Sequence, residues 1–227
     1  MIRDRLFRNA DIYSKLKSKP SQVDMQGWGS DHPILPWTIE QLRPNLIIEV
    51  GTWKGRSAIN MANKMKELEL QGEILCIDTW LGSSEHWLAG ESNLDWWESL
   101  KIKNGFPRLY ETFLNNVIAN QCEKYITPLP ITSEAAFQIL KSLSVTAPMI
   151  YIDAGHQYES VLRDLEMYWQ LLEDGGVMIL DDYIAWDGVT RAINTFAVKY
   201  NLVVYGEHGK AVITKNAQIH YATKIVF

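Results

Sequence analysis

Acidic side chains stand at or beside the carboxyl ends of four of the five apolar runs that predict buried strands. They are Glu49, Asp78, Asp153 and the adjacent pair Asp181 and Asp182. An unpaired acid is costly to bury, so their concentration at these positions needs a reason. In open parallel sheets, ligands bind beyond the carboxyl ends of the strands. We therefore expect these acids to belong to a ligand site.

The first strand-to-helix turn is EVGTWKGRS, residues 49–57, and it contains Gly51 and Gly55. A glycine lets the chain bend sharply and lets a ligand approach the backbone. The spacing differs from the G-x-G-x-x-G pattern of dinucleotide binders. Glu49 would repel a pyrophosphate and attract an ammonium or sulfonium group. The turn therefore favours a cationic cofactor with an amino-acid part over NAD, although its spacing alone fits an ordinary turn with an exposed Glu equally well.

Asp78 adds weight to the ligand interpretation. It lies 29 residues after Glu49, at the end of the next predicted strand. An acid at that position can accept hydrogen bonds from both hydroxyls of an adenosine ribose. The alternative is a solvated acid that merely ends a strand. Taken with Glu49 and the two glycines, Asp78 favours a nucleoside ligand.

The elements that must position these residues alternate between strands and helices. Continuous apolar runs predict strands buried on both faces at 46–50, 73–78, 149–153 and 177–180, with a weaker one at 125–131. Helices are expected at 57–68, 109–120, 133–143, 158–173 and 187–199, with Ser133 capping the third and Gly175-Gly176 ending the fourth. This alternation predicts an α/β fold, a mostly parallel sheet with helices on both faces. Two closing runs, 202–206 and 211–215, predict a hairpin with one antiparallel strand.

Composition excludes several classes of function. The chain has 227 residues with 22 Lys and Arg against 27 Asp and Glu, a net charge of −5. Without a basic cluster it is not expected to bind nucleic acid. No apolar run approaches the ~20 residues that span a bilayer, so no membrane partner is expected. Cys76 and Cys122 form no disulfide framework, and Cys76 lies in an apolar run, which favours a reduced, cytoplasmic protein.

Four segments resemble a known family. IIEVGTWKGRSAINMA, CIDTWLGS, YIDAGHQYESVLRDLEMYW and LLEDGGVMILDDY are similar to class I S-adenosylmethionine-dependent methyltransferases. The branch that they resemble most comprises small-molecule O-methyltransferases, among them macrolide and aminocoumarin sugar O-methyltransferases and cephalosporin-biosynthesis homologues. The resemblance covers about residues 34–215, and its motifs are specific as a set. It implies a Rossmann-like, seven-stranded sheet whose last strand is antiparallel.

The resemblance also implies a cofactor site. Glu49, Gly51 and Gly55 would contact the methionine part of S-adenosylmethionine, and Asp78 would hold its ribose. Thr132 and Ser133 would lie near the adenine. Backbone or hydroxyl groups of Thr52, Trp53 and Ser57 would bind the carboxylate, since the N-terminus of a helix favours an anion. Thr79, Trp80 and Asp153 complete the expected set.

Three acids form an expected metal site. Asp153, Asp181 and Asp182 would repel one another unless a positive group lies between them. Mg²⁺ takes oxygen ligands, and in the sugar O-methyltransferase branch three acids so arranged bind such an ion. It would hold two substrate oxygens and lower the pKa of the one to be methylated. Alternatively, the site holds no metal: Asp182 caps the next helix and Asp181 bonds only to backbone. Many members of the wider superfamily lack a metal.

His156 is the expected catalytic base. It follows Asp153 by three residues, and an imidazole can take a hydroxyl proton near neutral pH. The related sugar enzymes place a histidine base at the matching position. Two alternatives stay open: His156 is a structural residue bonded to a carboxylate, or Asp153 is itself the base.

A Trp-rich insertion is expected at about residues 80–108. Trp80, Trp87, Trp96 and Trp97 lie there with His86, and flat aromatic walls suit sugar or ring acceptors. Core packing or an oligomer interface explains the four tryptophans at least as well. Trp186 and the loop 27–33, with Trp28 and His32, are weaker candidates for ligand contacts.

The sequence thus predicts an enzyme that methylates a hydroxyl of a small molecule, a sugar or natural product, with S-adenosylmethionine and Mg²⁺. Residues 1–33 would form an N-terminal helix and loop extension, with the helix over 2–18, and 34–227 the methyltransferase domain. The alternatives are a metal-independent methyltransferase for another acceptor and a non-catalytic binding protein with this fold. An oxidoreductase is disfavoured by Glu49. The sequence leaves the oligomeric state open, including a homo-oligomer.

Overall fold

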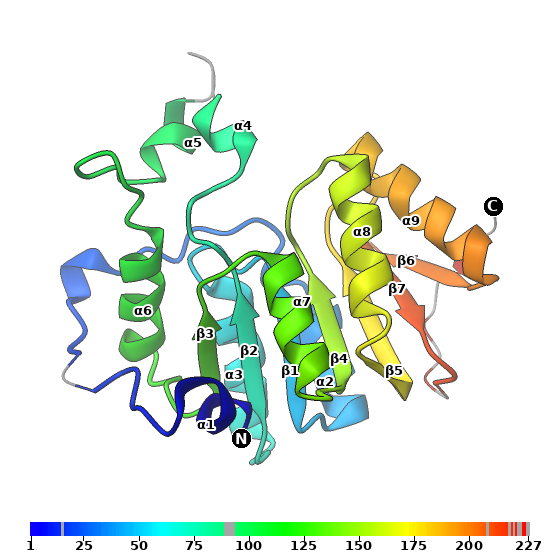
Figure 1. The fold of residues 1–227 in the computed structure, drawn as a ribbon, viewed down its shortest axis with the longest axis horizontal. Helices are drawn as coiled ribbons and strands as arrows, with labels where there is room; N and C mark the ends of the chain where they lie inside the picture. The colour runs from blue at the N-terminus through cyan, green and yellow to red at the C-terminus, as the bar shows by residue number, and fades with distance from the viewer. Residues whose placement is uncertain are drawn as a thin grey trace.

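The computed structural model describes residues 1–14, 16–88, 94–207, 209–217, 219, 221 and 224–225. Within these residues, eight strands form one sheet in the order β3-β2-β1-β4-β5-β7-β6-β8, as Figure 1 shows. The strands are β1 (Leu46–Val50), β2 (Glu73–Ile77), β3 (Ile126–Leu129), β4 (Ala147–Ile152), β5 (Leu172–Leu180), β6 (Val204–Glu207), β7 (Lys210–Thr214) and β8 (Lys224–Ile225).

Strands β1 to β5 are parallel to one another, whereas β7 runs antiparallel between β5 and β6. The mostly parallel sheet with an antiparallel closing strand is therefore confirmed. The two-residue strand β8 adds to the seven expected strands and pairs with β6. All five residues of β2 are buried, which explains why its sequence is apolar without alternation.

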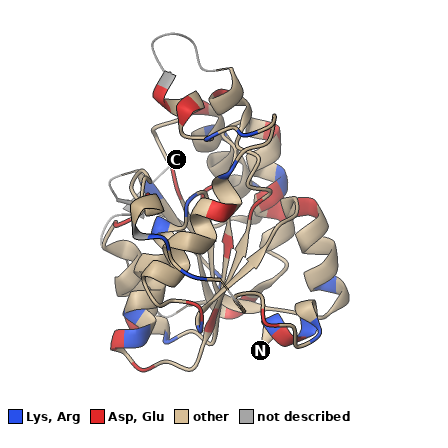
Figure 2. Cartoon of the chain, turned by 90° about the vertical axis from the view of Figure 1, so that its left-hand side faces the viewer, with Lys and Arg blue, Asp and Glu red and all other residues tan. Residues whose placement is uncertain are grey.

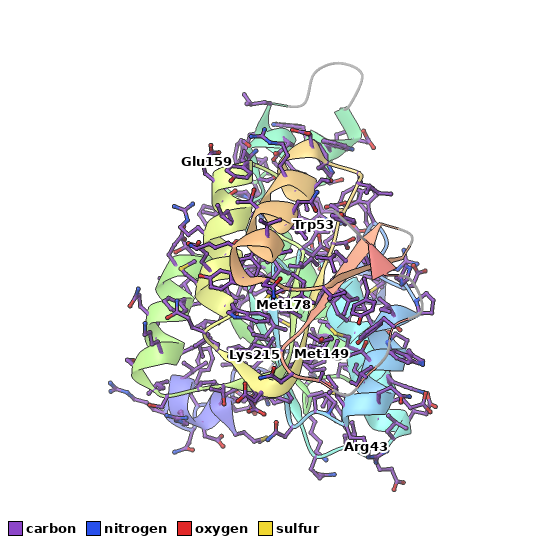
Figure 3. The ribbon with its side chains drawn as sticks, turned by 90° about the vertical axis from the view of Figure 1, so that its right-hand side faces the viewer. Arg43, Trp53, Met149, Glu159, Met178 and Lys215 are labelled. Atoms are coloured by element: carbon purple, nitrogen blue, oxygen red, sulfur yellow. The ribbon has the colours of Figure 1, made fainter. Side chains whose placement is uncertain are left out.

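Helices cover both faces of the sheet. They are α1 (Ile2–Phe7), the short 3₁₀ helix Pro20–Gln22, α2 (Ile34–Leu42), α3 (Arg56–Glu67), α4 (Ser84–Trp87), α5 (Leu94–Glu98), α6 (Leu109–Ala119), α7 (Ser133–Ser142), α8 (Tyr158–Tyr168) and α9 (Asp187–Tyr200). Helices α7, α8 and α9 pack on one face, and α2, α3 and α6 pack on the other. In Figure 3, Met178 lies toward α8 and α9, whereas Met149 on the neighbouring strand lies toward α2 and α3.

Two expected helices are shorter than the sequence indicates. Helix α1 ends at Phe7 because Arg8 and Asn9 adopt left-handed backbone angles, φ 52° and 62°. The chain then runs as a loop along α6, where Asn115 and Asn116 accept backbone hydrogen bonds from Lys19 and Asp24.

Helix α8 ends at Tyr168, and Gly175-Gly176 lies inside β5 instead of ending the helix. The Gly175 N–H donates to the carbonyl of Lys215 at 2.6 Å, so the two glycines belong to the sheet's hydrogen-bonding pattern. This part of β5 meets β4 across a register shift between Ala147 and Met149.

The small helices α4 and α5 lie at the top of the molecule in Figure 1, above the sheet. Acidic residues gather on them in Figure 2, while Lys and Arg are scattered over the visible elements. Among the described helices, none has both the length and the apolarity needed to cross a bilayer. Both cysteines are buried and unpaired, as expected.

Candidate active site

A cavity of about 580 Å³ opens at the carboxyl ends of the parallel strands. That volume lies in the range of small-molecule sites. The expected site residues that border it are Gly51, Thr52, Trp53, Ser57, Asp78, Thr79, Thr132, Ser133, Asp153, His156, Asp182 and Trp186. The cavity therefore brings together residues from the ends of five strands. The other expected residues, Glu49, Gly55, Trp80 and Asp181, lie behind this lining and support it.

Two glycines of the first turn are required by geometry. At Gly51, φ is 81°, and a Cβ atom would lie 1.9 Å from the carbonyl oxygen of Asp153. At Gly55, φ is 86°, and a Cβ atom would lie 2.7 Å from the ring of Phe113. Gly51 thus lets the ends of β1 and β4 touch, whereas Gly55 lets α3 begin against α6.

Glu49 lies beneath the turn and is fully buried. Its carboxylate accepts hydrogen bonds from the hydroxyls of Thr52 at 3.0 Å and Ser57 at 2.5 Å. Burial raises the pKa of Glu49 to about 7, because these neutral donors only partly offset the loss of water. The two hydroxyls expected to bind a cofactor carboxylate therefore fix the turn from below.

Asp78 borders the cavity and gathers backbone donors. Its Oδ2 accepts from the N–H groups of Thr52 at 2.9 Å and Trp53 at 2.8 Å, and its Oδ1 accepts from Trp80 N–H at 2.7 Å. Burial raises the pKa of Asp78, while the backbone hydrogen bonds act in the opposite direction. This acid joins the turns after β1 and β2.

The turn after β3 is built by hydroxyl groups. Thr132, not Ser133, is the N-cap of α7, and its Oγ1 accepts from Ala135 N–H at 3.2 Å. Ser133 instead donates to Asp164 of α8 at 2.7 Å. Burial raises the pKa of Asp164 to about 6. Asp164 also borders the cavity. This residue was missed from the sequence, because an acid within a helical face carries no signal of a site.

The acids after β4 and β5 contact a shared tyrosine and a lysine. The Tyr151 hydroxyl lies between Asp153 and Asp181, 3.2 Å from one carboxylate and 2.5 Å from the other. Lys210, at the start of β7, forms an ion pair with Asp181. Burial, followed by the charges of Asp181 and Asp182, raises the pKa of Asp153 well above its usual range.

His156 lies over the cavity in a defined orientation. Its Nε2 is 3.0 Å from Asp182 Oδ2, and its ring stacks on Trp186 with the centroids 4.2 Å apart. Asp182 has a left-handed backbone, φ 60°, which is unusual for a residue with a side chain. Within the described residues, His156 Nδ1 is buried without a hydrogen-bond partner. The nearest carboxylate to Nδ1 is Glu85 of α4, at 3.7 Å.

Aromatic rings form part of the cavity wall. Trp53 stacks on His86 at 4.3 Å, and Trp28 and Trp96 lie about the same pair at 6.0 to 6.3 Å. All four rings border the cavity. The N-terminal loop therefore reaches the site through Trp28, while His32 lies outside the cavity and accepts a hydrogen bond from Ile34 N–H.

The tryptophans of the insertion divide into two groups. Trp80 is 1% exposed, packs on Tyr110 and Phe113, and donates its indole N–H to the carbonyl of Trp53. It is a core residue that supports the turn, as the core-packing alternative predicts. Trp87 and Trp97 are 45% and 44% exposed and do not border the cavity, so only Trp96 of the four does.

The fold and a family match together define a class: a Rossmann-like methyltransferase. A family model described as "Methyltransferase domain" matches residues 48–183, more than half of the chain. The chain belongs to this methyltransferase-domain family. A curated viral protein, "Uncharacterized protein R132" of Acanthamoeba polyphaga mimivirus, is 38% identical over 50 residues, 22% of this chain and 23% of that protein. The chain thus spans about a quarter of that relative's length.

Solved structures share the fold at low identity. The O-methyltransferase NovP superposes with a TM-score of 0.60 at 18% identity, over 82% of this chain and 79% of that chain. An O-methyltransferase from Bacillus cereus, solved in complex with SAH, gives 0.56 at 15% identity, over 90% and 95%. The calicheamicin methyltransferase CalS11 gives 0.58 at 17% identity, over 80% and 76%.

Proposed function

We propose that this chain transfers the methyl group of S-adenosylmethionine to a hydroxyl group of a small molecule, a sugar or natural product. The observation that carries the proposal is the placement of His156 at the cavity, with Nε2 beside Asp182 and its ring stacked on Trp186. A histidine oriented by a carboxylate can remove a proton from a hydroxyl near neutral pH. Solved structures with this fold include O-methyltransferases, one of them a TDP-rhamnose 3'-O-methyltransferase, which supports the acceptor class.

The residues of the first three turns fit the methyl donor. Gly51 borders the cavity with backbone alone, and the Trp53 indole N–H is a buried donor without a partner among the described residues. Asp78 would accept from the ribose hydroxyls, and Thr132 and Ser133 would flank the adenine. The bound donor supplies an activated sulfonium methyl group.

Asp182 Oδ2 lies 3.0 Å from His156 Nε2, close enough to orient the imidazole. The acceptor hydroxyl would give its proton to the imidazole of His156 as its oxygen forms a bond to the methyl carbon and the carbon–sulfur bond breaks. Stacking on Trp186 holds the ring in place. The chain's contribution is to position and deprotonate the acceptor.

The expected magnesium site is not supported by the side-chain geometry. Asp181 is bound by Lys210 and Tyr151, Asp182 faces His156, and Asp153 shares Tyr151. Among the described residues, no three His, Cys, Asp or Glu side chains are placed together to hold a metal ion. The proposed reaction therefore uses no step through a metal, which corresponds to the metal-independent alternative.

The experiment compares donor binding with turnover in a His156→Asn variant. S-adenosylhomocysteine affinity is measured by titration calorimetry, and turnover is measured as S-adenosylhomocysteine release with sugar nucleotides, polyols and phenols as acceptors. We expect wild-type turnover with at least one acceptor, a loss of about 100-fold or more in the variant, and unchanged affinity.

His32→Asn is the matched control, because His32 lies outside the cavity and its loss should leave turnover unchanged. Wild-type turnover in His156→Asn would remove the base from the proposal. Failure of the wild type to bind either S-adenosylmethionine or S-adenosylhomocysteine would overturn the proposal as a whole and leave a non-catalytic protein.

A further inference from the structure

Lys210 is a buried cation beside the acids of the site, and the reaction proposed above does not use it. The residue is 1% exposed. Its Nζ forms an ion pair with Asp181 and lies 3.2 Å from the Tyr151 hydroxyl. A buried ammonium is tolerated only when it is paired and hydrogen-bonded, and these two partners meet that need.

The sheet register places Lys210 beside Asp181. Leu180 pairs with Ala211 across the antiparallel strands β5 and β7, so the next residue on each strand, Asp181 and Lys210, also meet. The lysine therefore approaches the acid cluster from the strand side, underneath the cavity. It is not among the residues that border the cavity.

The N-terminal loop closes over this ion pair. Gly29 has φ 58°, and a Cβ atom there would lie 3.0 Å from Lys210 Nζ and 3.8 to 3.9 Å from the Asp181 oxygens. A glycine at this position lets the backbone lie above the pair without displacing the Lys210 ammonium. The loop thus keeps water from the pair, which strengthens the attraction between its charges.

A chain of contacts leads from Lys210 to the base. Asp181 Oδ1 accepts a hydrogen bond from the backbone N–H of Asp182 at 2.7 Å. This contact supports the left-handed backbone of Asp182, from which its carboxylate reaches His156. A displaced Asp181 would therefore displace Asp182 and its contact with the imidazole.

We propose that Lys210 is a fixed internal cation of the acid cluster. It neutralises Asp181 in place of a divalent ion. It is also a positioning residue, because it orients His156 through Asp181 and Asp182. This inference rests on the proposed function for its catalytic consequence. Its electrostatic part concerns metal binding and stands independently of turnover.

The experiment uses Lys210→Met, Lys210→Arg and a control just past the end of the same strand, Lys215→Met. Lys215 donates to the Leu172 carbonyl at 2.7 Å, and Figure 3 shows it far from Trp53, toward the other end of the molecule. Mn²⁺ binding is followed by electron paramagnetic resonance, S-adenosylhomocysteine affinity by calorimetry, and turnover with and without EDTA.

We expect the wild type to bind no stoichiometric Mn²⁺ at about 1 mM and to keep its turnover in EDTA. Lys210→Met should bind one Mn²⁺, because the acids lose their cation, and should lose about tenfold or more in kcat with unchanged affinity for S-adenosylhomocysteine. Lys210→Arg should recover most of the turnover, and Lys215→Met should behave as the wild type.

The inference would be overturned if the wild type bound stoichiometric Mn²⁺ and EDTA abolished its turnover. It would also be overturned if a folded Lys210→Met variant kept full turnover or bound no Mn²⁺. Should that variant not fold, Asp181→Asn with Lys210→Met removes both charges together. The double variant should remain about tenfold or more below the wild type in kcat, and full turnover would overturn the inference. Absence of any donor binding in the wild type would instead refute the proposed function, while the Mn²⁺ titrations would still test Lys210.

Discussion

The two halves of the site satisfy their acids in different ways. In the donor half, the turns after β1, β2 and β3, Glu49 and Asp78 are held by hydroxyl and backbone N–H groups. In the acceptor half, the loops after β4 and β5 with the start of β7, Asp181 and Asp182 face Lys210 and His156. The donor half is thus fixed by backbone conformation, and the acceptor half by charged or titratable side chains.

This difference determines how each half should fail. Backbone donors are in place only when the chain bends correctly, so the donor half depends on its glycines and on the integrity of the turns. A side-chain cation can be exchanged for another of the same charge without leaving a buried acid unpaired, so such exchanges in the acceptor half should lower turnover before they affect the structure. The two halves can therefore be separated by substitutions that change only one of three measured properties: stability, donor affinity or kcat.

The largest effect is expected at Gly51. Gly51→Ala would place a Cβ atom 1.9 Å from the Asp153 carbonyl at φ 81°, so β1 and β4 would have to separate. We expect a loss of about 4 kcal/mol or more in the free energy of unfolding, measured by urea denaturation, and no donor binding.

Gly175→Ala is the matched control for Gly51→Ala. Gly175 has the same φ of 81°, but a Cβ atom there meets nothing within 4 Å. Its substitution should cost only the left-handed backbone term, about 1–2 kcal/mol. Equal losses at the two glycines would show that close approach of β1 and β4 does not matter.

A second effect concerns the pH dependence of stability. The pKa of Glu49, raised by burial to about 7, means that the folded chain holds a proton that the unfolded chain releases at lower pH. The contribution of Glu49 to stability should therefore be fully present below about pH 4.5 and be lost as pH rises to about 7, a change of up to about 3 kcal/mol. Glu49→Gln should lose this part of the slope in chemical denaturation across that range.

Asp164 provides the internal check on that slope. Its pKa, raised by burial to about 6, gives a second loss of stability at lower pH, which Glu49→Gln should leave unchanged. Asp164→Asn should remove only that lower part. A wild-type stability that does not change over the whole range would contradict both assignments.

The donor half could be largely predicted from the sequence because its signals are local. Glycines that must bend and an acid at the next strand end are visible as spacing. The same logic missed the strand start at Leu172, because Gly175-Gly176 looks like a helix end unless the pairing with β4 is known. It also missed Lys210, because a lysine before an apolar run normally indicates surface. Only the register Leu180 to Ala211 places that lysine beside Asp181.

Asp78 offers a direct test of the donor half against the acceptor half. Asp78→Asn removes the charge that would bind the ribose hydroxyls, so affinity for S-adenosylhomocysteine should fall about 10- to 100-fold. The kcat at saturating donor should fall far less than in His156→Asn. Asp174→Asn, at the distant start of β5, removes one charge without touching the cavity and should change neither quantity. The opposite pattern, lost kcat with full affinity, would assign Asp78 to the acceptor half.

The smallest effect is expected at Thr132, where two roles can be separated. Its Oγ1 accepts from Ala135 N–H, so Thr132→Ala should lower the free energy of unfolding by about 1 kcal/mol, while Thr132→Ser keeps the cap. Because that oxygen is engaged in capping α7, affinity for S-adenosylhomocysteine should stay unchanged in both variants. If Thr132→Ala instead weakened the affinity without a change in stability, the hydroxyl would serve the adenine directly, and the donor half would depend on a side chain as the acceptor half does.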